Sequence, residues 1–268
     1  MLSKDSANAY RVYWKKDAFY EELIEKVARY GGMKMLKAIF FDMGNTLVKY
    51  YERHEFDAIL KQGIQNVKDY LYCEGFRIPS EEELWEKVKS ENHESADNAV
   101  RPLEERLKKI FNLNKTYINS NIELEMCRCF MKPIFSRSSC YDDVLPVLKR
   151  LKEKELKITV VSNTAWGSPA VLWMEELKRY HINIYIDDAV FCRDVGWRKP
   201  AKQIFEYVLE KHNLNADECI FVGDDLRWDI VGSEAVDIKA ILINRSGNQA
   251  ANVKTMVTDL YQLMDLVN

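Results

Sequence analysis

Acidic side chains follow two apolar runs of this 268-residue chain, at positions where a strand would end. The first run is Ala38-Ile39-Phe40-Phe41, and Asp42 comes directly after it. An aspartate carried on a strand end into a small turn can act as a nucleophile. The second run, 219–222, is followed by Asp224, Asp225 and Asp229. Carboxylates about 4 Å apart repel by about 4 kcal/mol at an effective dielectric near 20, so the cluster needs a cation. Hard oxygen ligands favour magnesium.

Two further loops carry groups that suit an anion. Ser162-Asn163-Thr164 follows the apolar run 158–161 and offers a hydroxyl and free backbone N–H groups. Lys199 lies in Gly196-Trp197-Arg198-Lys199-Pro200, before a helical segment. Its ammonium group would supply a fixed positive charge, either to a phosphate or to the nucleophile carboxylate.

The elements that must position these loops alternate between strand and helix. Apolar runs occupy 38–41, 158–161, 184–191, 219–222 and 240–243, and helical segments such as 144–153 and 204–212 separate them. This alternation predicts an α/β fold, a Rossmann-like doubly wound sheet of parallel strands that helices cover on both faces. The prolines of Ser168-Pro169 and Lys199-Pro200 are placed where a first helical turn accepts them. Ligands of such sheets bind beyond the carboxyl ends of the strands.

The order of the runs predicts an insertion. No strand-like run occurs between Tyr50 and Cys140, where helical spacing recurs over 52–72, 80–91, 101–111 and 122–135. We expect a Rossmann-like core of residues 33–50 and 141–268, with an all-helical cap domain of residues 51–140 as a lid over the carboxyl edge. Residues 1–32 form a separate amphipathic helical extension that either packs on the core or serves as a dimerising or partner-binding arm.

Composition excludes several kinds of partner. The net charge of −3 creates no global field that favours nucleic acid or an anionic membrane, and no apolar run approaches the ~18 residues of a membrane span. The six cysteines include no CxxC pair, so a zinc site is not expected. With no signal-peptide pattern in residues 1–17, we expect a cytoplasmic protein. The loops that suit a phosphate favour a small phosphorylated metabolite as its partner, and a homodimer is possible through the cap or the N-terminal helix.

In this order and on these strand ends, the four loops resemble those of the haloacid dehalogenase-like (HAD) hydrolase superfamily, whose members are mostly magnesium-dependent phosphatases. The resemblance covers residues 36–50 and 141–247, and the helical insert resembles that superfamily's cap of the first type. It implies that Asp42 attacks phosphorus and forms an aspartyl-phosphate, while Lys199 neutralises the nucleophile and the transferred oxygens. An aspartyl-phosphate splits one difficult displacement into two easier ones.

The resemblance also implies roles for the remaining loop residues. Asp42, the Gly44 carbonyl and Asp224 would coordinate Mg²⁺ directly, whereas Asp225 and Asp229 would support its bound waters. The phosphoryl oxygens would be held by the Ser162 hydroxyl and the Asn163 N–H. In the first loop, Asn45 and Thr46 are assigned to the phosphate site, where Thr46 would brace the loop.

One position departs from the superfamily. Most of its phosphatases carry an aspartate two positions after the nucleophile, which protonates the leaving oxygen and then activates water, and this chain has Gly44 there. A positioned acid or base contributes ~10²- to 10⁴-fold, so alkyl phosphates should turn over slowly unless another group substitutes. His54 is the best-placed substitute in the sequence, because histidine titrates near neutral pH. A solvated histidine at a helix start is the alternative.

Three functions therefore remain open. The protein is a phosphatase or phosphotransferase that uses a good leaving group or an acid from the cap, or it is a carbon-halogen or phosphonate hydrolase. The superfamily branches with these last two activities also lack the second aspartate, and phosphonate cleavage would need a cap lysine such as Lys61 or Lys68. The third possibility is a catalytically weak protein that binds a phosphorylated ligand.

Side chains beside the loops could add substrate contacts. Trp166, Trp197 and Trp228 could wall a pocket, although aromatic residues beside such loops more often serve packing. Arg198 and Arg227 are either surface charges or ligands for a second anionic group of the substrate, and the sequence does not decide between these roles.

Overall fold

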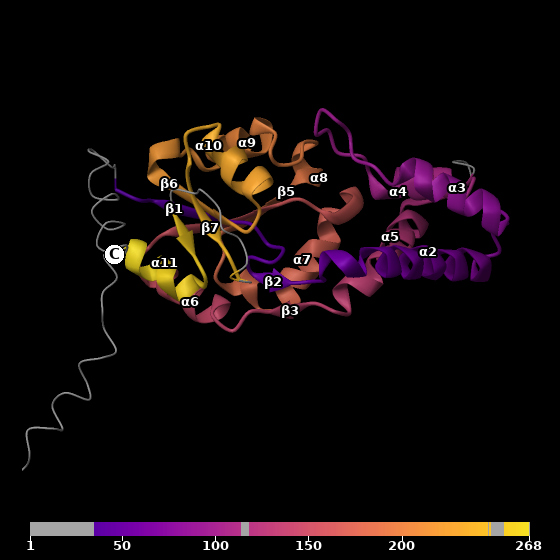
Figure 1. The fold of residues 1–268 in the computed structure, drawn as a ribbon, viewed down its shortest axis with the longest axis horizontal. Helices are drawn as coiled ribbons and strands as arrows, with labels where there is room; N and C mark the ends of the chain where they lie inside the picture. The colour runs from indigo at the N-terminus through magenta and orange to yellow at the C-terminus, as the bar shows by residue number, and fades with distance from the viewer. Residues whose placement is uncertain (1–34, 114–117, 246, 248–254, 268) are drawn as a thin grey trace, which may run out of the picture.

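The computed structural model describes residues 35–113, 118–245, 247 and 255–267. The structure has a larger and a smaller lobe, and two adjacent stretches of the chain connect them (Figure 1). The helix that we expect within residues 1–32 lies outside the described residues.

A parallel sheet of six strands forms the centre of the larger lobe and confirms the predicted α/β fold. The central strand β1 (Ala38–Phe41) pairs with β4 on one side and β6 on the other, so that Phe41 lies beside Val160 and Val222. Because the strands are parallel, their carboxyl ends share one edge of the sheet. The strand order is β5 (Asp188–Phe191), β4 (Lys157–Ser162), β1, β6 (Cys219–Gly223), β7 (Lys239–Ile243), β8 (Met256–Val257).

Alternate side chains of the strands enter two different cores. In β1, Ile39 and Phe41 belong to the larger core, and Ala38 and Phe40 belong to the core on the opposite face. Since both faces are covered, the strands appear in the sequence as continuous apolar runs. The first face is covered by α6 (Val144–Glu153), α7 (Ala170–Arg179) and α11 (Leu260–Leu266), and the second by α8 (Cys192–Val195), α9 (Lys202–His212) and α10 (Gly232–Glu234).

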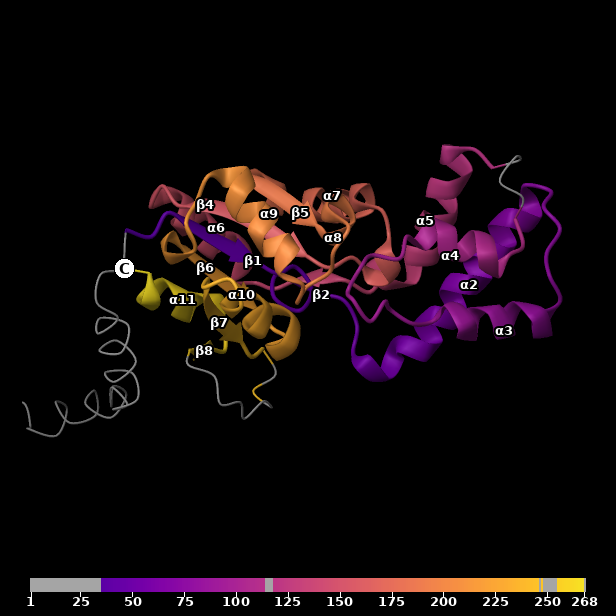
Figure 2. The ribbon, with the colours of Figure 1, turned by 90° about the horizontal axis from the view of Figure 1, so that it is seen from above.

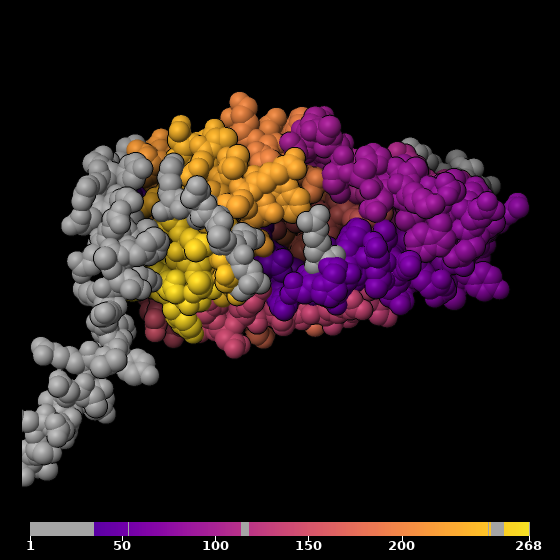
Figure 3. Space-filling view, in the orientation of Figure 1, coloured from indigo at the N-terminus to yellow at the C-terminus, as the bar shows by residue number. Residues whose placement is uncertain are grey.

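The smaller lobe is helical and extends away from the sheet (Figures 1 and 2). After a short 3-10 turn, η1 (Arg53–Glu55), it contains α2 (Phe56–Cys73), α3 (Glu81–Glu91), α4 (Leu103–Ile110) and α5 (Ser120–Phe135). The chain enters this lobe after β2 (Val48–Lys49) and leaves it before β3 (Ser139–Cys140), and these two short strands pair antiparallel. Figure 3 shows a recess where the indigo segment that enters the smaller lobe meets the orange part of the larger one.

Two details of the sequence prediction were wrong. The run 184–191 was expected to be one strand, but Ile182–Ile184 forms a 3-10 turn and β5 begins only at Asp188. The reason is Asp187, whose carboxylate accepts a hydrogen bond from the backbone N–H of Ile158 and thereby occupies the start of the β4 ladder. Pro200 does not stand in a first helical turn, because α9 begins two residues later at Lys202.

Among the described residues, none of the helices combines the length and the apolar character that crossing a membrane requires.

Candidate active site

Asp42 leaves the end of β1 with its carboxylate oriented by two donors. The hydroxyl of Ser162, the last residue of β4, donates to Asp42 Oδ1 at 2.9 Å. Lys199 Nζ donates to the same oxygen at 2.6 Å. Within the described part of the chain, Oδ2 accepts no hydrogen bond and is the oxygen left for chemistry.

Lys199 is buried, with 1% of its side chain exposed, and all three of its ammonium hydrogens have acceptors. Besides Asp42, its Nζ contacts Asp229 Oδ1 at 2.7 Å and donates to the carbonyl of Val161 at 2.9 Å. Burial alone would lower the pKa of Lys199, but the carboxylates of Asp229 and Asp42 outweigh that effect and raise it. Lys199 is therefore a permanent cation at neutral pH.

The side chain of Asn163 holds the backbone of Lys199. Its Oδ1 accepts from Lys199 N at 2.8 Å, and its Nδ2 donates to Lys199 O at 3.1 Å. We expected only the backbone N–H of Asn163 to act, at the phosphate. This side-chain role was missed because nothing in the local sequence indicates which loop faces Asn163.

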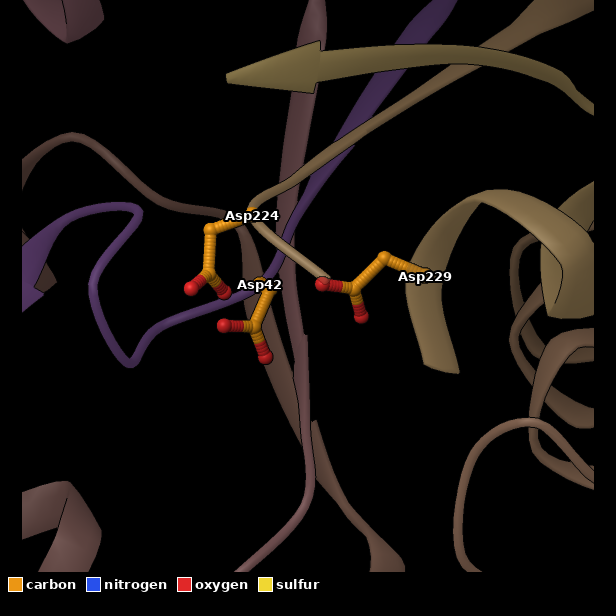
Figure 4. A group of neighbouring side chains, drawn as sticks. All are labelled: Asp42, Asp224 and Asp229. Atoms are coloured by element: carbon orange, nitrogen blue, oxygen red, sulfur yellow. The ribbon is translucent and has the colours of Figure 1, made fainter. Parts of the chain in front are cut away.

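Three carboxylates, one of them that of Asp42, converge at this edge of the sheet (Figure 4). One oxygen from each of Asp42, Asp224 and Asp229 lies within 4.8 Å of the others. Asp224 follows β6, and Asp229 reaches in from the π-helical turn η6 (Leu226–Val231). Asp229 can approach because residue 223 is glycine, where a Cβ would lie 2.4 Å from Asp229 Oδ2.

The electrostatics of this cluster fit a divalent cation. Burial and the neighbouring carboxylates Asp42 and Asp229 raise the pKa of Asp224, and burial also raises the pKa of Asp229. No hydrogen bond to the Asp224 carboxylate occurs in the described ranges, so its oxygens and Asp42 Oδ2 are available to a metal. Both Asp229 oxygens already have donors, one in Lys199 and one in the N–H of Asp225. Oxygen donors with unsatisfied negative charge suit Mg²⁺.

Asp225 is not part of the cluster. Its Oδ1 accepts from the N–H groups of Arg227 and Trp228, at 2.8 Å each, and so caps the start of η6. An acidic residue at a strand end and an acidic helix cap look alike in a sequence, since both precede a helical turn. The structure therefore gives Asp225 a capping role that the sequence did not indicate, and its support of metal-bound waters stays a prediction.

The first loop is held mainly through its backbone. Asn45 has the left-handed φ of 53°, its side chain is exposed, and its N–H donates to the carbonyl of Val48. The Thr46 hydroxyl is buried without a hydrogen-bond partner, while the Thr46 carbonyl accepts from Arg245 Nη2 at 2.6 Å. Arg245, which the sequence did not single out, also contacts Asp143 Oδ2 at 2.5 Å and so joins the loop to the core. Gly44 has an ordinary backbone conformation and room for a Cβ.

The other residues singled out in the sequence differ in burial and in the contacts they make. Trp166 is buried and packs against Phe130 of α5, whereas Trp228 is 40% exposed. His54 and Lys61 are exposed, and Lys68 forms an ion pair with Glu81 at 2.9 Å. None of these last three has a contact with Asp42 among the described residues.

Comparisons with known proteins show which family the chain resembles. The sequence profile of the haloacid dehalogenase-like hydrolases matches residues 36–237. The glyceraldehyde 3-phosphate phosphatase of Methanothermobacter thermautotrophicus is 26% identical over 241 residues, which are 87% of this chain and 100% of that protein.

Two solved structures show the same fold. A HAD phosphatase from Thermococcus onnurineus has a TM-score of 0.61 at 22% identity, covering 87% of this chain and 98% of its own. A 2-haloacid dehalogenase from Pseudomonas syringae pv. tomato has a TM-score of 0.60 at 19% identity, with the same shares covered. At these identities the likeness concerns the fold alone, and it does not separate phosphatases from dehalogenases.

A parallel sheet that presents a buried, lysine-bound aspartate beside an acidic cluster at its carboxyl edge is the architecture of an α/β hydrolytic enzyme. More specifically, the chain belongs to the haloacid dehalogenase-like hydrolases, because the family profile covers most of its length.

Proposed function

We propose that this protein is a magnesium-dependent phosphatase or phosphotransferase that transfers the phosphoryl group of a small phosphorylated metabolite to Asp42. The observation that supports this most directly is that the two oxygens of the Asp42 carboxylate have different contacts. Lys199 and Ser162 both bind Oδ1, Oδ2 accepts no hydrogen bond from the described residues, and the carboxylates of Asp224 and Asp229 lie close to that of Asp42. The relative from Methanothermobacter, named for its action on glyceraldehyde 3-phosphate, supports a small phosphate ester as substrate.

The first half of the reaction follows from these contacts. The Asp42 carboxylate attacks phosphorus, the bond from phosphorus to the leaving oxygen breaks, and its electron pair stays on that oxygen. Lys199 and the Ser162 hydroxyl keep the carboxylate oriented and place donors beside the transferred group. Mg²⁺, held by Asp42 and Asp224 with Asp229 close by, would offset the charge of the carboxylates and of the phosphoryl oxygens.

In the second half, water attacks the phosphorus of the aspartyl-phosphate, and the bond from phosphorus to the Asp42 carboxylate breaks. Phosphate leaves, and Asp42 returns as a carboxylate. A phosphotransferase would use a hydroxyl of an acceptor in place of water. We propose that residues 51–140 serve as the cap that covers the site during both halves and limits the access of bulk water.

Position 44 limits the leaving groups. Gly44 has no group that can protonate a leaving alkoxide, so the site favours acyl or aryl phosphates, whose leaving groups need no proton. His54, the substitute that we considered, is exposed. The structure therefore gives no support to a replacement acid at that residue.

The alternatives receive less support. A phosphonate hydrolase needs a lysine directed at the substrate, but Lys61 is exposed and Lys68 is bound to Glu81 on the outside of the smaller lobe. The dehalogenase branch of the superfamily needs no metal, whereas Asp224 and Asp229 crowd the nucleophile with negative charge that calls for a cation. A weakly catalytic binding protein would have the same contacts, and only a measurement of turnover distinguishes it from a phosphatase.

We infer a cytoplasmic enzyme with no nucleic-acid or membrane partner, from the slightly negative net charge and the ordinary composition. A homodimer through the smaller lobe or residues 1–32 stays a prediction.

The test is Asp42→Asn, assayed on phenyl phosphate and acetyl phosphate with and without Mg²⁺. The amide keeps the shape of the side chain but is a poor nucleophile, so turnover should vanish while the thermal midpoint changes little. Beryllofluoride, which mimics a phosphoryl group on a carboxylate, should bind the parent and fail to bind the variant. Phosphate release by the variant at the parent's rate would remove Asp42 from the mechanism, and ligand binding without turnover by the parent would favour the binding protein.

A further inference from the structure

Arg198 lies at the seam between the two lobes, beside the catalytic loop. It immediately precedes Lys199, and its guanidinium carbon is 5.7 Å from the ring centre of Trp228, which precedes Asp229. Its Nη1 lies 3.4 Å from Oε2 of Glu94, which belongs to the loop between α3 and α4 of the smaller lobe. Residues of the catalytic loop, of η6 and of the smaller lobe therefore meet at this side chain.

The backbone fixes Arg198 in this position. Its N–H donates to the carbonyl of Asn98 at 2.8 Å, and the Val100 N–H donates to the carbonyl of Gly196 at 2.9 Å. Ala99 and Trp197 pair between these two bonds as an antiparallel bridge. The loop from the smaller lobe thus attaches to the catalytic loop through main-chain bonds that do not depend on the guanidinium.

The guanidinium itself is poorly satisfied. Arginine has five N–H donors, and in the described ranges none of those on Arg198 makes a hydrogen bond, although the side chain is only 12% exposed. Its buried Nε has no partner, and neither does the buried Oε2 of Glu94, because their groups meet as an ion contact without hydrogen-bond geometry. Buried donors without acceptors are unfavourable, and an arginine in this state suits a planar anion that binds it through two oxygens.

Glu94 also serves a second arginine. Arg106, whose side chain is 2% exposed, contacts Glu94 Oε1 at 3.3 Å and stacks on Trp166 with its guanidinium carbon 3.9 Å from the ring centre. Its Nε is likewise buried without a partner. Two guanidinium groups thus share one carboxylate at the seam, beside the loops that hold Lys199 and Ser162.

We propose that Arg198 is a specificity residue that binds a second anionic group of the substrate, a carboxylate or a further phosphate on the leaving group, and that Glu94 occupies this position when substrate is absent. The proposal rests on the proposed function, because the second anionic group belongs to the leaving group of the phosphate ester that Asp42 attacks. Arg227, the other arginine considered from the sequence, is exposed and has no such contact among the described residues. The preferred substrates are phosphate monoesters with a second negative charge.

The experiment compares two ligands that differ by one charge, 2-phosphoglycolate and ethyl phosphate. Their dissociation constants are measured by calorimetry with Mg²⁺ in the Asp42→Asn background, where no turnover interferes. Arg198→Gln should raise the dissociation constant of 2-phosphoglycolate by about 10- to 100-fold, which corresponds to lost hydrogen bonds between charged groups. It should raise the dissociation constant of ethyl phosphate far less. Glu94→Gln should act in the opposite direction and strengthen 2-phosphoglycolate, because it removes the competing carboxylate.

Arg193→Gln is the matched control. Like Arg198, Arg193 is an arginine of the larger lobe that contacts an acid of the smaller lobe, with its Nη2 2.6 Å from Glu104 Oε1. Unlike Arg198, it is not next to Lys199 in the sequence. It should leave the ratio of the two dissociation constants unchanged. The proposal is overturned if Arg198→Gln changes the dissociation constants of both ligands by the same factor, or if Glu94→Gln weakens the binding of 2-phosphoglycolate. Turnover of phenyl phosphate by the parent protein is measured in parallel, so that a failure of the phosphatase proposal is recognised separately.

Discussion

Asn163 and Lys199 form a reciprocal pair in which one amide side chain binds both the backbone N–H and the backbone carbonyl of the lysine. The Asn163 amide accepts from the Lys199 N–H at 2.8 Å and donates to the Lys199 carbonyl at 3.1 Å. The loop after β4 thereby positions the loop before α9, although the two residues are 36 positions apart in the sequence. Lys199 reaches Asp42 only because its backbone is held in this way.

Asn163→Ala should therefore impair both stability and catalysis. Two buried backbone groups lose their partners, which costs about 1–3 kcal/mol in the free energy of unfolding for each group left unsatisfied. Because the ammonium group loses its fixed position, kcat should fall while magnesium affinity stays close to that of the parent. Urea unfolding, initial rates and calorimetry measure the three quantities.

Asn66→Ala provides a control for this prediction. Asn66 Nδ2 donates to the Cys129 carbonyl at 3.1 Å and joins α2 to α5 within the smaller lobe, far along the chain from the nucleophile. Its loss should lower stability without a fall in kcat. Equal effects of the two variants on kcat would mean that Asn163 has no positioning role.

The fold could be predicted because its strands are covered on both faces. Such strands read as apolar runs, and the polar residue that ends each run marks the functional edge, as Asp42 and Ser162 do. The short pair of β2 and β3 and the edge strand β8 have two residues each and give no periodic signal. They are fixed by the partners they meet in the fold, not by their own sequence.

The site could be predicted only in part, for a related reason. Residue types at strand ends indicate which groups gather, but not which atoms face each other. Lys199 and Asp42 are 157 positions apart, and nothing local shows that one ammonium group serves both Asp42 and Asp229. The capping role of Asp225 was missed because an acidic residue beside a metal site and a helix cap have the same local sequence pattern.

Lys199→Met should remove the cation that two buried carboxylates share. Breaking a buried ion pair from one side costs about 3–5 kcal/mol, so the midpoint of urea unfolding should fall clearly at neutral pH. Turnover should fall by about 10²- to 10³-fold, as when one preorganised donor is removed from an active site. The stability loss should shrink as the pH is lowered toward 5, because the uncompensated carboxylates can then take up a proton.

Lys202→Met is the matched control, since Lys202 starts α9 three residues later and its ion pair with Glu206 is largely exposed. Exposed pairs of this kind contribute about 0–1 kcal/mol. A stability loss in Lys202→Met as large as that in Lys199→Met would show that the effect is not specific to the buried site.

Gly44→Asp should supply the acid that the site lacks. A Cβ at this position would lie 3.8 Å from Tyr50 Cδ2 and 4.0 Å from Asp42 Oδ2, which are ordinary contacts. The variant should turn over alkyl phosphates faster relative to aryl phosphates, with an upper bound of about 10²- to 10⁴-fold from one positioned acid. Parallel kcat/KM values for ethyl and phenyl phosphate give the ratio. An unchanged ratio would mean that protonation does not limit the alkyl substrates.

Gly44→Asn is the control for this change, because it introduces a side chain of the same shape that cannot release a proton at neutral pH. The ratio should stay at the parent value. A rise in both variants would point to a steric effect of the new side chain against Tyr50.

Magnesium should stabilise the protein more at high pH than at low pH. In the metal-free protein the pKa of Asp224 is raised to about 8, by burial and by Asp42 and Asp229, from a value near 3.9 in the unfolded chain. Between these two values the folded state binds more protons than the unfolded state, so stability falls as the pH rises from about 5 to 8. A bound cation offsets this loss, and its binding at pH 7 releases protons. Thermal midpoints at several pH values, with Mg²⁺ or chelator, and calorimetry in two buffers of different ionisation enthalpy measure both effects.

Asp224→Asn and Asp225→Asn separate the cluster from its neighbour. Asp224→Asn should abolish the magnesium-dependent shift in the thermal midpoint and flatten the pH dependence of the metal-free protein. Asp225→Asn should change neither, because asparagine caps a helix as well as aspartate does and can still accept from the N–H groups of Arg227 and Trp228. If Asp225→Asn weakens magnesium as strongly as Asp224→Asn does, the carboxylate of Asp225 must turn toward the metal when it binds, and the separation between cap and ligand drawn from the structure is wrong.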